Sequence, residues 1–471
     1  MFKLIVEKEL REIIGSTKFA VTFGVAAVLI LLTFYVGAKN YQVSRAQYEA
    51  AKKENLRKME GQTDWLMVRN HRIFLPPQPL AILVTGISND VGRTIEVAGR
   101  GELAAQESRF NEDPIFAVFR FLDLDFIFQI VLSLFAILFA YDAVSGEKER
   151  GTLRLSFANN LPRGTFILGK ISGSFLALGV PLLVPILLGC VLLPLMGAPM
   201  TSDDWLKLGL IILAGLLYFG VFLTLSVFMS ALTQRSSHSF LLLLVMWVFT
   251  VLIIPRAAVL IAGRAVEVPS VDQIAAQKNR LRSQMWEEDR KRMSEFKPTP
   301  STNPADMMQE FNEFMQKNAE ERDKKMRELA SRLNEERRNR QLVQERVAFS
   351  LARVSPSAVF SLAATTLAST GLDLKEHFVN EATAYQQSYA SFIKEKTGMN
   401  LGGGFMVMRV TTGNEEEKKP IDPLELPEFT YHEQPRARVI QAAWFDFSLL
   451  AGFNLLFFAG AFVAFLRYDL R

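Results

Sequence analysis

Cysteine is nearly absent from this sequence of 471 residues. Cys190 is the only one, and it lies inside an apolar run. A disulfide needs two cysteines, so none can form within the chain, and any domain in an oxidising compartment must be held by packing alone. Histidine is also scarce, and its four residues are scattered over four regions. The sequence therefore shows no cluster with the spacing of a metal site.

Three further absences narrow the function. No Gly-x-x-x-x-Gly-Lys-Ser/Thr phosphate loop occurs, so we expect the chain to bind no nucleotide or other cofactor of its own. No basic patch is interleaved with aromatic residues, and the net charge is only +4, which argues against a nucleic-acid partner. Residues 1–18 are mixed in charge, and no small-residue cleavage site follows the next apolar run, so the start of the chain is not typical of a cleavable signal peptide.

What the sequence has in abundance is apolar segments long enough to cross a bilayer. Hydrophobic residues make up 49% of a chain in which 22% of residues are charged, a balance typical of a protein that lies partly in lipid and partly in water. The third apolar segment carries three prolines and is therefore expected to be kinked or made of two pieces. The six expected spans are residues 19–38, 125–143, 166–196, 205–232, 239–263 and 443–466.

Residues 1–18 predict an amphipathic helix at the membrane interface. Phe2, Ile5 and Leu10 recur at helical spacing, and charged residues cover the opposite face. A plain cytosolic start of the first span is the alternative.

Two polar inserts separate the spans. Residues 39–124 predict a small α+β domain, with a charged helix near 45–59 and a hairpin of strands at 79–86 and 93–97. Residues 264–442 form the larger insert. The fold class expected is mainly α: six spans, an amphipathic N-terminal helix and two inserts outside the membrane.

The larger insert predicts a helical hairpin that projects from the membrane. Apolar residues recur at helical spacing over 274–296 and 305–353, and a proline-rich turn separates the two segments. We expect a helix at the membrane surface near 355–371 and a short strand near 400–412.

Lysine and arginine in the short loops give an orientation. With six spans these residues fall on one side, which the positive-inside rule assigns to the cytosol. Both chain ends would then be cytosolic, both inserts would lie outside, and the membrane would be a bacterial inner membrane. The residues counted are Lys3, Lys8, Arg11, Lys18, Lys148, Arg150, Arg154, Arg163, Arg235, Arg467 and Arg471.

The densest charge between two spans lies in the cytosolic connection at residues 144–165. Charges this dense are costly in hydrocarbon, so this connection must lie at a membrane face. Mixed charge with apolar residues suits docking into a groove of another protein, and an ordinary solvated loop is the alternative. The candidate residues are Glu147, Lys148, Glu149, Arg150, Gly151, Thr152, Leu153 and Arg154.

Four charged residues near the ends of the spans can be explained by structural roles as well as by a function. Lys170 is expected to extend to the cytosolic face. Asp446 either pairs, faces a cavity or reaches the interface. Asp123 and Asp125 could bind a cation, although an outer helix flank is the usual explanation.

The connection resembles a known family. Residues 141–153, Tyr-Asp-Ala-Val-Ser-Gly-Glu-Lys-Glu-Arg-Gly-Thr-Leu, are followed by Leu-Pro-Arg at 161–163 and Gly-Lys at 169–170. This pattern is similar to the cytoplasmic segment of type-2 ABC exporter permeases (the ABC-2 family), and the six-span layout agrees. Large inserts after spans one and five resemble a subgroup with extracytoplasmic domains.

The resemblance implies a coupling helix around 147–155, seated in a cleft of a separate ATPase subunit. Two permease chains, identical or sister chains, and two ATPase subunits would form the exporter, which this chain serves without being an enzyme. In the alternative function, the complex moves no solute and works on a periplasmic envelope protein through its inserts. A membrane-anchored receptor is a third possibility. The size of the second insert leaves the substrate class open.

Overall fold

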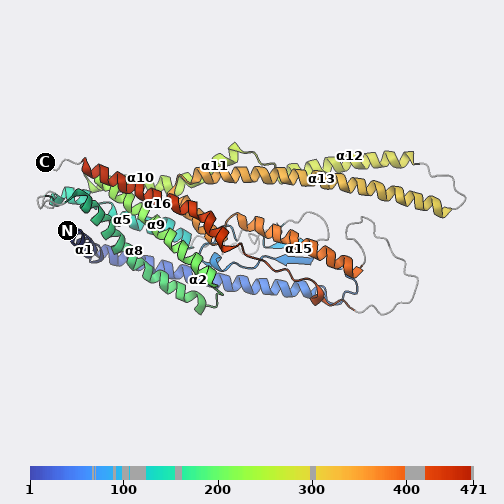
Figure 1. Ribbon diagram of the computed structural model, residues 1–471, viewed down its shortest axis with the longest axis horizontal. Coiled ribbons are helices and arrows are strands. Elements are labelled where there is room, and N and C mark those ends of the chain that lie inside the picture. Colours follow the sequence, from blue (N-terminus) through green and yellow to red (C-terminus); the bar gives the residue numbers. More distant parts are fainter. Residues whose placement is uncertain are drawn as a thin grey trace.

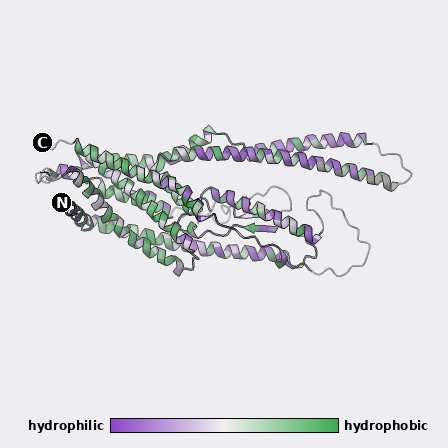
Figure 2. Cartoon of the chain, viewed as in Figure 1, coloured by the Kyte–Doolittle hydropathy of each residue, from purple (hydrophilic) through white to green (hydrophobic). Residues whose placement is uncertain are grey.

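A computed structural model describes residues 1–65, 68, 71–88, 92–97, 105–106, 123–153, 157, 162–296, 304–397 and 420–467. An apolar helical bundle occupies one end of an elongated molecule, and polar elements extend from the other end (Figures 1 and 2). Both ends of the chain lie at the outer end of the bundle, away from the polar elements (Figure 1).

Six segments of the described chain are long and apolar enough to cross a membrane. The third, α8, runs as one uninterrupted helix past all three of its prolines. The six segments are α2 (Thr17–Arg57), the run Leu124–Glu149 (α4, η4, α5 and α6), α8 (Arg163–Leu195), α9 (Ser202–Leu232), the run Ser236–Ala265 (α10, η5 and α11) and α16 (Arg436–Leu466).

The first span does not end at the expected membrane boundary. A turn at Gly15 separates α1 (Phe2–Ile14) from α2, and the Ser16 side chain caps α2 by accepting the Phe19 N–H at 3.1 Å. No proline or glycine follows Gly37 before Arg57, so the helix continues for 41 residues and includes the charged segment that was expected to be separate.

The small domain contains a three-stranded antiparallel sheet in the order β1-β2-β3. The strands are β1 (His71–Phe74), β2 (Thr94–Val97) and β3 (Ala105–Gln106). The prediction of a strand at 79–86 was wrong, because Pro79–Ile82 forms the short 3-10 helix η2. Proline at its start fixes the backbone angle, and Leu80 and Ile82 pack into the core of the bundle rather than into a sheet.

A second core lies in this domain, where α15 (Asp373–Thr397) packs with the sheet. His71 is buried there. Its Nε2 lies 3.0 Å from the Tyr385 hydroxyl, which donates to the Pro427 carbonyl, and its Nδ1 lies 3.2 Å from the Asn55 amide nitrogen. These partners fit a neutral ring that donates from Nε2 and accepts at Nδ1.

The stability of this domain should depend on His71. Burial lowers the pKa of His71 to about 4. The unfolded chain, with a pKa near 6.5, binds more protons between these values, so the contribution of His71 to stability is complete above about pH 6.5 and is lost as the pH falls toward 4. The loss should reach about 3 kcal/mol. Amide exchange in α15, corrected for intrinsic pH effects, measures it. A His71→Gln variant with the same pH dependence would contradict this prediction.

The larger insert contains the expected helical hairpin. Helix α12 (Val271–Glu295) and the 49-residue helix α13 (Pro304–Ala352) lie side by side (Figure 1). Arg322 pairs with Asp289 across the hairpin at 3.0 Å and stacks over the Trp286 ring. The base of α13 packs against α11 (Ile254–Ala265), so the hairpin is anchored on the fifth span.

Helix α14 (Pro356–Leu367) was expected to lie at the membrane surface. It is instead packed into the bundle against α9 and α16. Its Phe360 is fully buried and stacks on Tyr218, with ring centroids 5.1 Å apart. The expected strand at 400–412 and most of the expected turn at 297–304 lie outside the described residues.

Candidate functional site

The connection between the second and third spans lies at the end of the bundle where both chain ends lie. We call Asp142–Leu153 the coupling stretch; it contains the short helix α6 (Ser145–Glu149). Arg154, also predicted to belong to the site, lies outside the described residues.

Helix α1 packs directly against α8 beside this stretch. Two glycines of α8 permit the close approach: a Cβ added to Gly169 would lie 2.7 Å from the Ile5 side chain, and one added to Gly173 would lie 2.7 Å from Glu9. Of the predicted interfacial residues, Ile5 therefore faces α8, Leu10 packs against the core, and Phe2 remains 46% exposed.

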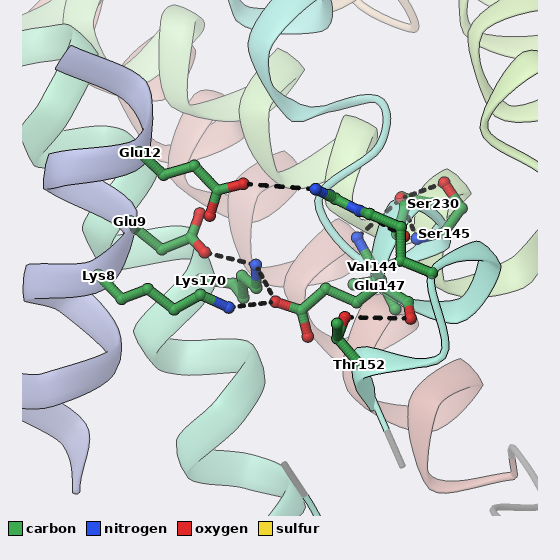
Figure 3. A network of polar contacts seen from close by, with 11 residues as sticks. Lys8, Glu9, Glu12, Val144, Ser145, Glu147, Thr152, Lys170 and Ser230 are labelled. Carbon is green, nitrogen blue, oxygen red and sulfur yellow. Dashed lines mark hydrogen bonds and ion pairs between the residues drawn. The ribbon is translucent and has the colours of Figure 1, made fainter. Parts of the chain in front are cut away.

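A charged network joins α1, α8 and the coupling stretch (Figure 3). Glu147 pairs with Lys170 at 2.8 Å and with Lys8 at 2.9 Å, and Lys170 also pairs with Glu9. The side chains of Glu9, Glu147 and Lys170 are only 5–6% exposed, whereas Lys8 is 54% exposed. The expectation that Lys170 extends to the cytosolic face was wrong, because its ammonium group is held between two buried carboxylates.

Burial raises the pKa of the Glu9 carboxyl, and the nearby Lys170 ammonium opposes that shift. The network holds two acids and two bases, so its formal charges balance. The three buried members, Glu9, Glu147 and Lys170, depend on one another, because an unpaired charge in a low-dielectric site is costly.

The coupling stretch is also tied to the following helices. The Ser230 hydroxyl accepts the backbone N–H groups of Val144 and Ser145, at 3.0 and 2.9 Å. Lys148 donates to the Ala231 and Thr233 carbonyls at the C-terminal end of α9, and Glu149 accepts the Ser236 N–H at the start of α10. Each charge thus meets the helix end of opposite polarity.

Only part of the predicted site remains open to a partner. Glu147 and Leu153 are buried, and Lys148 is half-buried against α9. Glu149, Arg150, Gly151 and Thr152 are exposed, and we call these four residues the docking rim. Gly151 has φ +70° with open space around it, a turn that glycine adopts without strain.

Sequence reasoning missed four residues that position this site: Lys8, Glu9, Ser230 and Ser236. Lys8 lies on the exposed side of α1, whereas Glu9 lies on the buried side with Ile5 and Ile13, and nothing in the sequence indicates that either has a partner near α8. No sequence pattern distinguishes Ser230 and Ser236 from the other serines of the chain.

One segment comes close to a phosphate loop. Residues 164–170 read Gly-Thr-Phe-Ile-Leu-Gly-Lys, but Ile171 stands where the motif needs serine or threonine. The structure places this segment inside α8, with Lys170 buried in the charged network, so its backbone cannot form a phosphate cradle.

Within the described residues, no three metal-binding side chains come together. Asp123 instead caps α4 (Leu124–Phe126) by accepting the Phe126 N–H at 2.9 Å. Asp125 accepts hydrogen bonds from Gln129 and from Ser361 of α14.

A family model described as ABC-2 family transporter protein matches residues 4–470, nearly the whole chain. The chain belongs to the ABC-2 transporter family. This ABC-2 permease is an integral, multi-pass membrane protein and a permease component of an ABC transporter. Permeases of this family generally work with an ATPase partner. Among curated proteins, no sequence matches the chain closely enough to count as a relative.

Proposed function

We propose that this permease couples ATP hydrolysis by a separate ATPase subunit to export of a substrate across or out of the membrane. The docking rim supports this proposal: four exposed residues stand on a stretch that is fastened to three spans and to α1. A push on the rim would therefore move several helices together. The chain itself would bind no cofactor, and ATP would be held by the partner.

The orientation follows from the loop charges. We place the protein in a bacterial inner membrane, with both chain ends and the docking rim in the cytosol and both inserts outside. Two permease chains, identical or sister chains, would assemble with two ATPase subunits. An envelope protein could then meet the inserts.

Reversing the charge of Arg150 tests the coupling role. Arg150 is exposed, its Nη1 lies 3.9 Å from Glu12, and its Nε donates to the Gly146 carbonyl within the same turn at 3.0 Å, so Arg150→Glu should leave the packing of the spans unchanged. We expect it to weaken ATPase binding about tenfold or more and to abolish stimulation of ATP hydrolysis by the permease. Co-purification and ATPase rates of the reconstituted complex measure both.

Arg467→Glu is the matched control, since it makes the same charge change in an exposed side chain at the same end of the bundle. Full stimulation in the Arg150→Glu complex, or an equal loss in both variants, would overturn the coupling role.

A second function, mechanical work on an envelope partner, is favoured by how the hairpin is attached. Helix α13 packs on the fifth span, and Arg353 just beyond its end pairs with Asp446 of the sixth span at 2.6 Å. Spin labels on cysteines introduced at Glu313 and Lys394, both exposed, would report hairpin movement, because the natural Cys190 is buried. A label distance that changes with ATP supports this function, and an unchanged distance argues for export alone.

A further inference from the structure

A groove in the smaller domain lies far from the docking rim. It runs between the extended part of α2, strand β1 and the segment 420–431, which we call the strap. Two cavities of about 280 and 230 Å³ form this groove. Asn55, Arg72 and Phe74 line both cavities, so these residues stand where the two meet.

The strap is fastened over the groove at three points. The Ile421 N–H donates to the Gln62 carbonyl at 2.8 Å, and the Tyr385 hydroxyl donates to the Pro427 carbonyl at 2.8 Å. Lys52 pairs with Glu428 at 2.5 Å. The larger cavity is therefore built by three separate elements rather than by a chance gap at one loop.

The walls of the larger cavity are mostly apolar. Aromatic rings and leucines predominate, as in pockets that take small organic ligands. They include Tyr48, Leu56, Phe74, Leu424, Leu426 and Phe429.

Arg72 is the charged residue that lines both cavities of the groove. Asn55 holds its backbone on both sides, donating to the Arg72 carbonyl at 2.9 Å and accepting the Arg72 N–H at 3.1 Å. The Nε of Arg72 is buried without a hydrogen-bond partner. None of the ion pairs given for the described residues involves Arg72. Of the other charged residues in the walls, Lys52 pairs with Glu428 and Glu54 pairs with Arg57, while Lys58 lines only the smaller cavity.

Although its Nε is closed to solvent, Arg72 as a whole is partly exposed and lines both cavities, so a ligand in the groove would meet the accessible part of this cationic side chain. The planar fork of arginine matches a carboxylate, which can accept two parallel hydrogen bonds. The apolar walls would then cover the rest of such a molecule.

We propose that this groove binds small carboxylates that carry an aromatic or other apolar body, with the carboxylate on Arg72 and the body against the rings and leucines of the walls. This site is independent of the proposed coupling at the docking rim. A ligand seated here would contact both α2 and the strap, which leads into α16.

The test uses the full-length permease in lipid nanodiscs and 2-naphthoate as the probe. Saturation-transfer NMR, with empty nanodiscs subtracted, should show saturable binding. Naphthylmethanol and naphthylmethylammonium have the same ring system without the negative charge, and we expect them to bind at least tenfold more weakly. Equal binding of all three, or no saturable binding of 2-naphthoate, would overturn the proposal.

Arg72→Gln should weaken 2-naphthoate binding at least tenfold. Arg72→Lys keeps the charge but loses the planar fork, so its affinity should lie between those of the unchanged protein and of Arg72→Gln. Arg45→Gln is the matched control, because Arg45 also lies on α2 but is exposed and lines neither cavity. Exchange protection of α15 shows whether each variant is folded. Unchanged binding in a folded Arg72→Gln variant would refute the role of Arg72.

Discussion

Replacing Lys170 by methionine should destabilise the bundle by about 3–5 kcal/mol, the usual result of removing one partner from a buried ion pair. Methionine fits the volume of the lysine chain, but it leaves the Glu9 and Glu147 carboxylates buried without the cation between them. We also expect α1 to detach from α8. Unfolding can be followed with a thiol-reactive dye, since Cys190 is buried in the same helix and is the only cysteine.

Lys8→Met is the matched control. Lys8 contacts the same Glu147 carboxylate, but it is half exposed, so its loss should cost no more than about 1 kcal/mol. Adding Glu9→Gln to Lys170→Met should restore part of the lost stability, because it removes the buried Glu9 charge, which has lost its cation, whereas Glu147 still pairs with Lys8. Equal effects of Lys170→Met and Lys8→Met would contradict this description of the network.

Replacing Arg353 by methionine should have the second-largest effect. Asp446 is 2% exposed and accepts from Nε and Nη2 of Arg353, at 2.6 and 3.2 Å. Without the guanidinium its carboxylate would remain buried and unpaired, at a cost of about 3–5 kcal/mol. The same thiol-dye unfolding curve measures the change, and amide exchange at the base of α13 should increase.

The double variant Arg353→Met with Asp446→Asn separates charge from packing. We expect it to be clearly more stable than Arg353→Met alone, because the neutral amide is far less costly to bury than a carboxylate. If the double variant lost the sum of the two single losses, the pair would not interact and the anchoring of the hairpin on the sixth span would be wrong.

The membrane part of this fold could be predicted from hydropathy because lipid imposes a simple rule on length and polarity. The helical hairpin was also predictable from its spacing. The strand expected at 79–86 failed for a physical reason: a short apolar run looks the same whether it enters a sheet or packs into the bundle. Leu80 and Ile82 do the latter.

The site was predictable as a stretch but not as a set of contacts. Charge density and the family pattern indicated residues 147–154, yet they could not show which side chains point inward. The Glu147 side chain of α6 reaches Lys170 of α8, and Glu9, which also pairs with Lys170, lies 161 residues before it in the sequence. Asp446 was left between pairing and exposure, and its partner lies 93 residues earlier in the sequence.

The uninterrupted course of α2 gives the molecule a lever arm. Its 41 residues make a rod of about 60 Å, of which the hydrocarbon core covers about half. A tilt of about 10° pivoting at the N-terminal end of α2 would therefore carry the far end sideways by about 10 Å. A small rotation of α2 at the membrane would therefore displace the walls of the Arg72 groove by a larger distance. A ligand that holds these walls together would in turn oppose rotation of α2.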